Sequence, residues 1–439
     1  MGGRRERARQ SLQSFRPLPI ATMTNVSSDI PALAVIQAAL RKTTETVAAE
    51  LAQPTPVAPD WSEFEWRIAR AVAAIHGVAP LLAGALRWPG PAGWREFLED
   101  QRAQTAARHA RIEALLRIVD DSARNAGIGA VALKGAALHA MDVYGAGERP
   151  MGDIDLLVRN VDAERTVRML ESVGFEEAFA TWKHRVLTPK AHQRPARSLG
   201  EHADNFLKVE LHERIAEALP IKTEDVTERV LPRLHTGLNG YPSKAALMVH
   251  LLLHAAGGMV THELRLLHLH DIAHLSRRMT EAEWEQVLEY SAADGGYWWA
   301  WPPLSLTARY YSRAIPAEVL SGLEAECPWL LGMAVRRCTL SDVSLSNLRI
   351  EAFPGIEWCR SGGTALRYII GRVRPSRATL ATRVQLASTQ LNASASPWPH
   401  LSQGRRILRW LISRQARAET LYPVQLALTG ASNRWRGTA

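Results

Sequence analysis

The spacing of hydrophobic and polar residues changes twice along the chain. Residues 30–51 and 61–126 place apolar side chains at steps of three and four, which predicts helices on both sides of a proline-rich break. From about residue 125 the pattern shifts to short apolar or alternating runs, and between about 220 and 330 it returns to helical spacing. The pattern therefore predicts a small sheet region set between helical regions.

The region 125–215 alternates strand-like and helical segments. Residues 153–158 alternate and then become wholly apolar, as a strand buried at one end does, and residues 161–173 form an amphipathic helix closed by Gly174. The remaining predicted elements are a helix over 135–144 and strands over 130–133, 175–179, 185–188 and 206–212. This order predicts a helix-rich α+β protein with a small α/β core and flanking helical regions.

Five regions follow from the pattern and the local composition. They are a disordered basic arm (1–30), a helical N-terminal region (31–124), the sheet core (125–215), a helical domain (216–345) and a basic Arg-rich C-terminal region (346–439). The longest apolar stretch, residues 245–260, is interrupted by His250, His254 and a glycine pair. It therefore predicts a buried helix, and no transmembrane segment is expected.

Composition and charge narrow the class of protein. The 439 residues are 46% apolar and 22% charged, which excludes a wholly disordered or fibrous chain. Three scattered cysteines exclude a disulfide framework and favour a cytoplasmic location. The last 80 residues hold thirteen Arg, no Lys and one acid, or +12, so the other 359 carry +9 − 12 = −3. Within them, the basic amphipathic stretch 404–421 either packs on the protein or binds an acidic partner, nucleic acid or anionic lipid.

Two carboxylates in the predicted strand 153–158 are the strongest chemical signal. Asp153 and Asp155 are two residues apart, so they share one face of the strand and repel each other unless a cation lies between them. Mg²⁺ prefers carboxylate and phosphate oxygens together, and a metal pair can activate a hydroxyl and stabilise a leaving phosphate. The alternative is a solvated Asp-x-Asp at a strand edge.

Further candidate site residues lie before and after this strand. Lys134 and Gly135 occupy a turn from a buried strand into a helix, where glycine allows close approach of a ligand and free N–H groups can bind phosphate. Arg149 adds positive charge just ahead of the carboxylates. Downstream, Glu210 and His212 share one face of a predicted strand, and Glu210 can supply a third carboxylate.

Together these motifs resemble those of the uncharacterised bacterial nucleotidyltransferase family, within the polymerase-β-like nucleotidyltransferase superfamily. The motifs are Leu133-Lys134-Gly135, Tyr144, Arg149-Pro150-Met151-Gly152-Asp153-Ile154-Asp155-Leu156-Leu157-Val158, Gly174-Phe175 and Val209-Glu210-Leu211-His212. The resemblance covers roughly residues 125–215 and extends loosely to about 290. It implies a polymerase-β-like core that transfers a nucleotidyl group, AMP by default, from an NTP to an acceptor hydroxyl and releases pyrophosphate.

The resemblance also implies roles for single residues. Asp153 and Asp155 would bind Mg²⁺ or Mn²⁺, and Glu210 would be the third carboxylate, which orients or deprotonates the acceptor. Gly135 and Ala136 would contact the phosphates through their backbone. The superfamily usually has Gly-Gly or Gly-Ser at this turn, so a hydroxyl contact from the second position is lost here.

Several assignments stay open at this stage. Lys134 and Arg149 are candidates, on charge alone, for contact with the triphosphate. The acceptor is a small molecule, a peptide, a protein or an RNA end, and Lys183-His184-Arg185 either lines its side of the site or forms a solvated strand face. One competing function is a catalytically degenerate protein that binds a nucleotide or a partner. Another is metal-dependent phosphohydrolysis at His270 and Asp271, which are more simply interpreted as buried or cleft-lining.

Overall fold

A computed structural model describes residues 31–191, 198–220, 222–231, 233–291, 296–376, 380, 402–412 and 416–429. The chain divides into two compact units, residues 1–36 and residues 37–439. The basic arm predicted for residues 1–30 lies outside the described residues. The sheet and the helices that follow it belong to the second unit.

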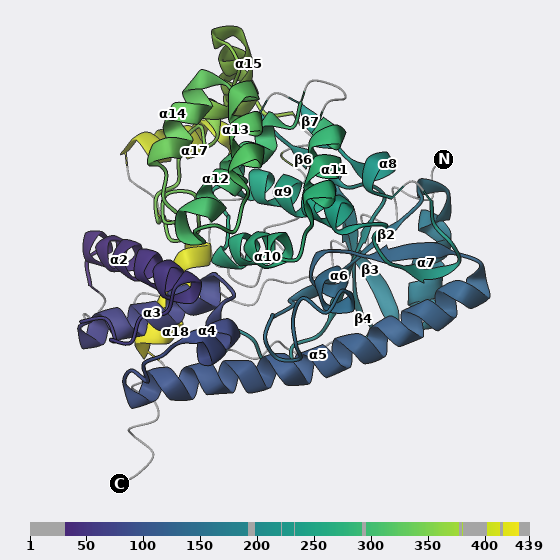
Figure 1. Ribbon diagram of the computed structural model, residues 1–439, viewed down its shortest axis with the longest axis horizontal. Coiled ribbons are helices and arrows are strands. Elements are labelled where there is room, and N and C mark those ends of the chain that lie inside the picture. The colour runs from purple at the N-terminus through teal and green to yellow at the C-terminus, as the bar shows by residue number, and fades with distance from the viewer. Residues whose placement is uncertain are drawn as a thin grey trace. The chain divides into compact units, whose positions relative to one another are not determined.

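A six-stranded mixed sheet organises the second unit (Figure 1). Its order is β3-β4-β5-β2-β1-β8, with β2 parallel to β5, β1 parallel to β8 and the other neighbours antiparallel. Its strands are β1 (Gly129–Ala132), β2 (Asp153–Val158), β3 (Phe175–Ala180), β4 (His184–Pro189), β5 (Lys208–His212) and β8 (Gly237–Asn239). The predicted α+β class is confirmed, although β8 lies beyond the segment in which strands were expected.

Helices surround this sheet in the sequence, as predicted. Those before it are α2 (Leu33–Ala52), α3 (Glu63–Ile75), α4 (Ala79–Ala85) and α5 (Ala92–Ala126). Those between its strands are α6 (Lys134–Ala140), α7 (Ala163–Ser172) and the short α8 (Thr227–Val230). Those after it are α9 (Lys244–Thr261), α10 (Leu266–Ser276), α11 (Glu281–Ser291), α12 (Trp301–Tyr310), α13 (Ala317–Glu326), α14 (Trp329–Arg337), α15 (Gly362–Val373), α17 (Gln403–Ile412) and α18 (Ala418–Thr429). A small hairpin joins β6 (Ala216–Ala218) to β7 (Thr223–Asp225).

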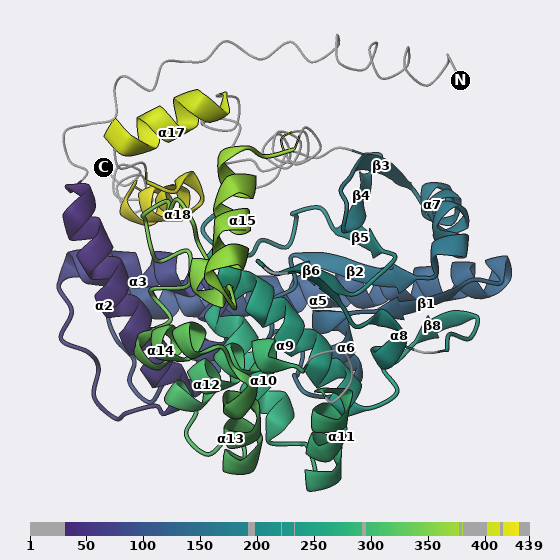
Figure 2. The same cartoon turned by 90° about the horizontal axis from the view of Figure 1, so that it is seen from above.

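The two faces of the sheet have different environments. On one face, Ile154 and Leu156 of β2 are buried in a core that includes Val119 of α5 and Leu170 of α7. Figures 1 and 2 show α5 passing along this side of the sheet. Because successive strand residues point to opposite faces, the intervening acidic residues of β2 point away from this core. The alternating pattern thus creates a polar face on a sheet whose other face is buried.

The stretch predicted to be a buried helix forms α9. Its N-terminus is capped by the Ser243 side chain, which accepts from the N–H of Ala246, and most of its residues are buried. By length and composition α9 could cross a membrane, yet 78% of it is buried within the fold, as in a core helix. The α3–α4 pair passes the same test only as one span bent by 112°. Figure 2 shows α9 beside α10 and α12, with which it packs.

The basic C-terminal stretch is not one continuous element. We predicted an amphipathic segment over 404–421, but α17 ends at Ile412, and Ala416 forms a β-bridge with Arg349. The buried guanidinium of Arg417, which follows this bridge, donates to the backbone carbonyl of His262 at 3.0 Å and so attaches the segment to the end of α9. The indole N–H of Trp410 donates to the Ile350 carbonyl at 2.8 Å, although this side chain stays 36% exposed, so the choice between packing and partner binding for this stretch stays open.

Candidate active site

Parallel pairing of β2 with β5 brings the predicted carboxylates together. Asp153 pairs with Lys208, and Asp155 pairs with Glu210. Directly paired residues of neighbouring strands point to the same face, and residues two apart do so as well. Asp153, Asp155 and Glu210 therefore share the face opposite the α5 and α7 core, as expected from the sequence. The side chain of Asp153 is 36% exposed, whereas that of Glu210 is 17% exposed.

Asp155 is the buried centre of this group. Its Oδ1 accepts hydrogen bonds from Lys134 Nζ at 2.9 Å and from His212 Nε2 at 2.8 Å. Burial alone would raise the pKa of Asp155, but the Lys134 charge and the His212 hydrogen bond outweigh burial and hold this pKa well below its usual value. Asp155 is therefore an anion that is already partly neutralised by the protein.

Lys134 owes its position to an unusual backbone conformation. The preceding N–H, of Leu133, donates to the backbone carbonyl of Asp155 at 2.9 Å, which fixes the turn beside β2. Lys134 itself has φ +48°, in the left-handed region that costs a residue with a side chain about 1 kcal/mol or more. Burial lowers the pKa of Lys134, but the Asp155, Asp153 and Glu210 carboxylates raise it above its ordinary value. The turn thus holds a permanent cation against the acidic face.

Glu210 has less compensating charge than Asp155. Its carboxylate lies 4.0 Å from Lys208 Nζ, and this ammonium is also 4.0 Å from Asp153. Burial, followed by repulsion from Asp153 and Asp155, raises the pKa of Glu210 to about 7. Sequence reasoning missed Lys208, although the two-residue period that joined Glu210 to His212 also includes it.

Arg149 has a different partner from the one expected. Its buried guanidinium pairs with Asp271 of α10, through Nε to Oδ1 at 2.9 Å and Nη2 to Oδ2 at 2.7 Å. The Tyr144 hydroxyl donates to the same carboxylate at 2.9 Å. Contact with a triphosphate would require Arg149 to give up part of this pairing, so that role stays a prediction.

The glycine turn packs closely on its surroundings. The Cα of Gly135 faces Arg149, and a Cβ built there would overlap the Nη1 atom of that guanidinium and lie 2.9 Å from the Met151 side chain. Ala136 has its methyl group in the sheet core, and its N–H donates to the Leu133 carbonyl at 3.2 Å. The need for glycine therefore has a packing explanation in the protein itself, and the phosphate contacts expected of both residues stay predictions.

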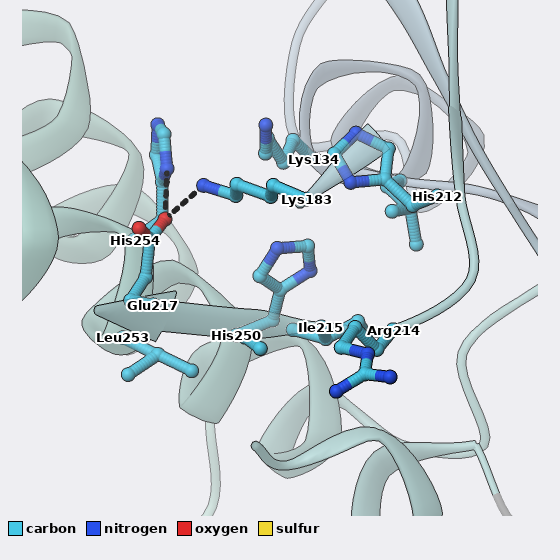
Figure 3. A pocket seen from close by; sticks show the side chains of 11 residues that line it. Lys134, Lys183, His212, Arg214, Ile215, Glu217, His250, Leu253 and His254 are labelled. Carbon is cyan, nitrogen blue, oxygen red and sulfur yellow. Dashed lines mark hydrogen bonds and ion pairs between the residues drawn. The ribbon is translucent and has the colours of Figure 1, made fainter. Parts of the chain in front are cut away.

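A small pocket adjoins the acidic face (Figure 3). It lies between the turn at Lys134 and helix α9, and His212 and His250 line it. At its other side Glu217 forms an ion pair with Lys183 and accepts from His254 Nδ1 at 3.3 Å. The lining includes three cationic side chains and three imidazoles, but the pocket volume of about 10 Å³ leaves room for little more than one water molecule.

The side chains of His270 and Asp271 are both engaged by other groups of the protein. Asp271 is engaged by Arg149 and Tyr144, and His270 Nδ1 lies 3.0 Å from the buried Tyr311 hydroxyl. This agrees with the interpretation of these residues as buried. In the part of the chain that the structure describes, the group of His, Cys, Asp and Glu side chains with converging ligand atoms is instead His184, Glu210 and His212.

The geometry defines a class of protein: an α+β fold with a carboxylate-lined face beside a cationic turn. The sequence model of the family described as uncharacterised nucleotidyltransferase matches residues 62–298, and the chain belongs to this family. No curated protein and no solved structure matches the chain significantly. Family membership points to nucleotidyl transfer in general, and the match includes all the residues of the acidic face.

Proposed function

We propose that this protein is a nucleotidyltransferase that uses Mg²⁺ or Mn²⁺ to move a nucleotidyl group, AMP by default, from an NTP to an acceptor hydroxyl. The observation that carries the proposal is the shared face of Asp153, Asp155 and Glu210 beside the Lys134 turn. Phosphoryl transfer depends chiefly on positioning and on stabilisation of charge, and this face offers groups for both.

The donor set fits a hard divalent cation. Three carboxylates supply the oxygen ligands that Mg²⁺ prefers. Burial, and after it the neighbouring Asp153 and Asp155 carboxylates, raise the pKa of Glu210, so a cation bound beside it would stabilise its ionised form. Asp153, Asp155 and Glu210 would hold the cation, which when bound would stabilise charge on the phosphates and on the attacking oxygen.

The protein's own groups have distinct tasks in this proposal. The acceptor oxygen bonds to the α-phosphorus as the bond to the β-phosphate breaks, and pyrophosphate leaves with the electron pair. Glu210 orients the acceptor hydroxyl and takes its proton at a carboxylate oxygen. Lys134 offers its ammonium to the negative charge of the triphosphate. Gly135 and Ala136 contact the phosphates through their backbone, and the Arg149 guanidinium packs against Gly135 of this turn.

One observation favours the competing function, a protein that binds a nucleotide without chemistry. Lys134 and His212 already satisfy Asp155 without any added cation. If this internal neutralisation is permanent, the face would bind phosphate through Lys134 and leave the nucleotide intact. The two functions differ in whether label from the α-phosphate reaches an acceptor.

The decisive experiment follows that label. The protein is incubated with Mg²⁺ and each α-³²P-labelled NTP, together with small-molecule, RNA or protein fractions of a cell extract as sources of acceptor. Asp153→Asn is the variant of choice, because Asp153 is half-exposed and its loss leaves the buried Lys134–Asp155 pair intact. We expect transfer to fall at least about 10²-fold, since a preorganised charge at the reacting phosphate is lost.

The matched control is Asp204→Asn, which removes an exposed carboxylate outside the site and should leave transfer unchanged. Thermal unfolding of both variants shows whether the fold is preserved. Full activity of Asp153→Asn would overturn the proposed site. Absence of transfer by the unmodified protein with every NTP, combined with measurable nucleotide binding, would favour the binding function.

A further inference from the structure

Two imidazoles lie on the acidic face beside Glu210. His184 of β4 pairs with His212 of β5, and Val186 pairs with Glu210 in the same antiparallel ladder. Paired residues of neighbouring strands share a face, so both rings project toward the carboxylates. Their ring centroids are 5.1 Å apart. The site is therefore richer in nitrogen ligands than a face of three carboxylates.

The ligand atoms converge on one point. His184 Nε2 is 3.7 Å from Glu210 Oε2, His212 Nε2 is 4.0 Å from the same oxygen, and all three ligand atoms lie within 4.8 Å of one another. Donors about 2.0–2.1 Å from a tetrahedral ion are about 3.3 Å apart, so shifts of less than about 1 Å would close this group around an ion. Three of the four positions are thus nearly preformed.

A further carboxylate lies next to His212, outside the group of three converging ligand atoms, and it also accepts from Lys134. His212 Nε2 donates a hydrogen bond to Asp155 Oδ1 over 2.8 Å. An ion bound to His212 Nε2 would replace that proton and leave the carboxylate beside the metal. In addition, the buried Nδ1 of His184 has no hydrogen-bond partner among the described residues, so no hydrogen bond to Nδ1 fixes this ring.

We propose that His184, His212 and Glu210, with Asp155 as the fourth ligand, form a binding site for a divalent transition-metal ion of the Zn²⁺ type. Imidazole ligands favour Zn²⁺, Co²⁺ and Ni²⁺ over Mg²⁺, which prefers oxygen alone. The site shares Asp155 and Glu210 with the cation site of the proposed function, but it does not depend on the transfer reaction. The proposal predicts that the acidic face binds Zn²⁺, Co²⁺ or Ni²⁺ in preference to Mg²⁺.

The experiment measures metal binding without nucleotide. Purified protein is dialysed against Zn²⁺ or Co²⁺ in the presence of excess Mg²⁺, and bound metal is counted by elemental analysis. We expect one tightly bound ion in the unmodified protein and at least a tenfold weaker affinity in His184→Ala, since changes around metal ligands already cost about 10–100-fold. The visible spectrum of the Co²⁺-loaded unmodified protein should indicate four-coordinate nitrogen and oxygen ligation.

Controls separate this site from the other histidines. His202→Ala removes a half-buried imidazole elsewhere and should bind the ion as the unmodified protein does. His254→Ala tests the neighbouring His254 and His268 pair, whose rings are 4.8 Å apart, and should also retain binding. Unchanged affinity in His184→Ala, or a Co²⁺ spectrum of six oxygen ligands, would overturn the proposal; the spectrum remains informative if the variant fails to fold.

Failure of this proposal can be told apart from failure of the transferase. Asp153 is not among the four ligands, so Asp153→Asn should lose label transfer and still bind Zn²⁺. Zinc binding without transfer in the unmodified protein would leave the metal site standing and remove the proposed function. Label transfer without zinc binding would remove the metal site and leave the proposed function standing.

Discussion

Gly135 illustrates how closely single residues are fitted around the candidate site. Its Cα faces the guanidinium of Arg149, where a methyl group would overlap Nη1. We predict that Gly135→Ala lowers the free energy of unfolding by about 1–3 kcal/mol, the usual cost of forcing extra volume into a packed site. Chemical denaturation monitored by tryptophan fluorescence would measure the change.

Gly152→Ala is the matched control for that substitution. Gly152 lies beside Asp153, has no atom within 4 Å of a built Cβ and does not adopt a positive φ. Its replacement should therefore change the free energy of unfolding by less than about 0.5 kcal/mol. If the two variants are equally stable, the close approach of Arg149 to the turn is not a structural constraint.

At the scale of single residues, the sequence predicted some of the side chains that share a face but not the contacts between them. The two-residue period placed Asp153 with Asp155 and Glu210 with His212, because strand geometry alone requires it. The contact between Lys134 and Asp155 was not predictable, since it depends on a left-handed turn at a residue that is not glycine. The charge of Lys134 indicated that this residue could belong to the site, but it did not indicate which residue Lys134 would contact.

Among the elements, the pairing of β2 with β5 determines the site. The two strands are about fifty residues apart, and a shift of one position would turn Glu210 to the opposite face. Alternation within each strand was evident from the sequence, and the family resemblance implied that Glu210 joins Asp153 and Asp155, whereas the parallel pairing and its register were not predicted. The place of His184 required a second register, between β4 and β5, that no local pattern contains.

The buried ion pair of Arg149 with Asp271 joins the segment before β2 to helix α10. Removal of one partner leaves a charge without compensation in the interior. We predict that Asp271→Asn lowers the free energy of unfolding by about 3–5 kcal/mol. The double variant Arg149→Met with Asp271→Asn should lose less than the sum of the losses in Arg149→Met and in Asp271→Asn, as measured by a double-mutant cycle in urea.

An exposed ion pair supplies the comparison. Arg336 Nη1 lies 2.6 Å from Glu324 Oε1, and the two side chains are 54% and 45% exposed. Glu324→Gln should therefore lower the free energy of unfolding by no more than about 1 kcal/mol. A loss in Asp271→Asn as small as that of Glu324→Gln would show that the buried pair does not hold the two elements together.

On the scale of the whole molecule, the C-terminal helix returns to the N-terminal helices. Helix α18 packs against α3, and Val424 and Ala427 of α18 are buried. The sequence indicated the positive charge of the C-terminal region but not this contact, because long-range packing leaves no local period. Whether the basic region binds an acidic partner stays an open alternative, and α17 leaves Leu411 and Ile412 exposed.

His76 connects several of these distant segments. It follows α3, accepts the N–H of Leu266 at Nδ1 over 3.0 Å, and donates from Nε2 to the Ser346 hydroxyl at 3.0 Å. The Ser346 hydroxyl in turn lies 2.7 Å from that of Thr44. The accepting role of Nδ1 requires a neutral ring, and burial, together with the charge of Arg265, lowers the pKa of His76 to about 3.

This network predicts how stability depends on pH. In the unfolded chain His76 takes up a proton below about pH 6.5, whereas in the folded protein it stays neutral down to about pH 3. The stabilisation of the folded protein by His76 is therefore complete above about pH 6.5 and is lost as the pH falls toward 3. Other buried histidines act in the same direction, so the informative quantity is the difference in unfolding free energy between the unmodified protein and His76→Asn. Between about pH 7 and about pH 5.5 this difference should shrink by about 1 kcal/mol in urea denaturation. A constant difference would mean that His76 is protonated as readily in the folded protein as in the unfolded chain, and that the neutral ring is not what joins α3 to the start of α10.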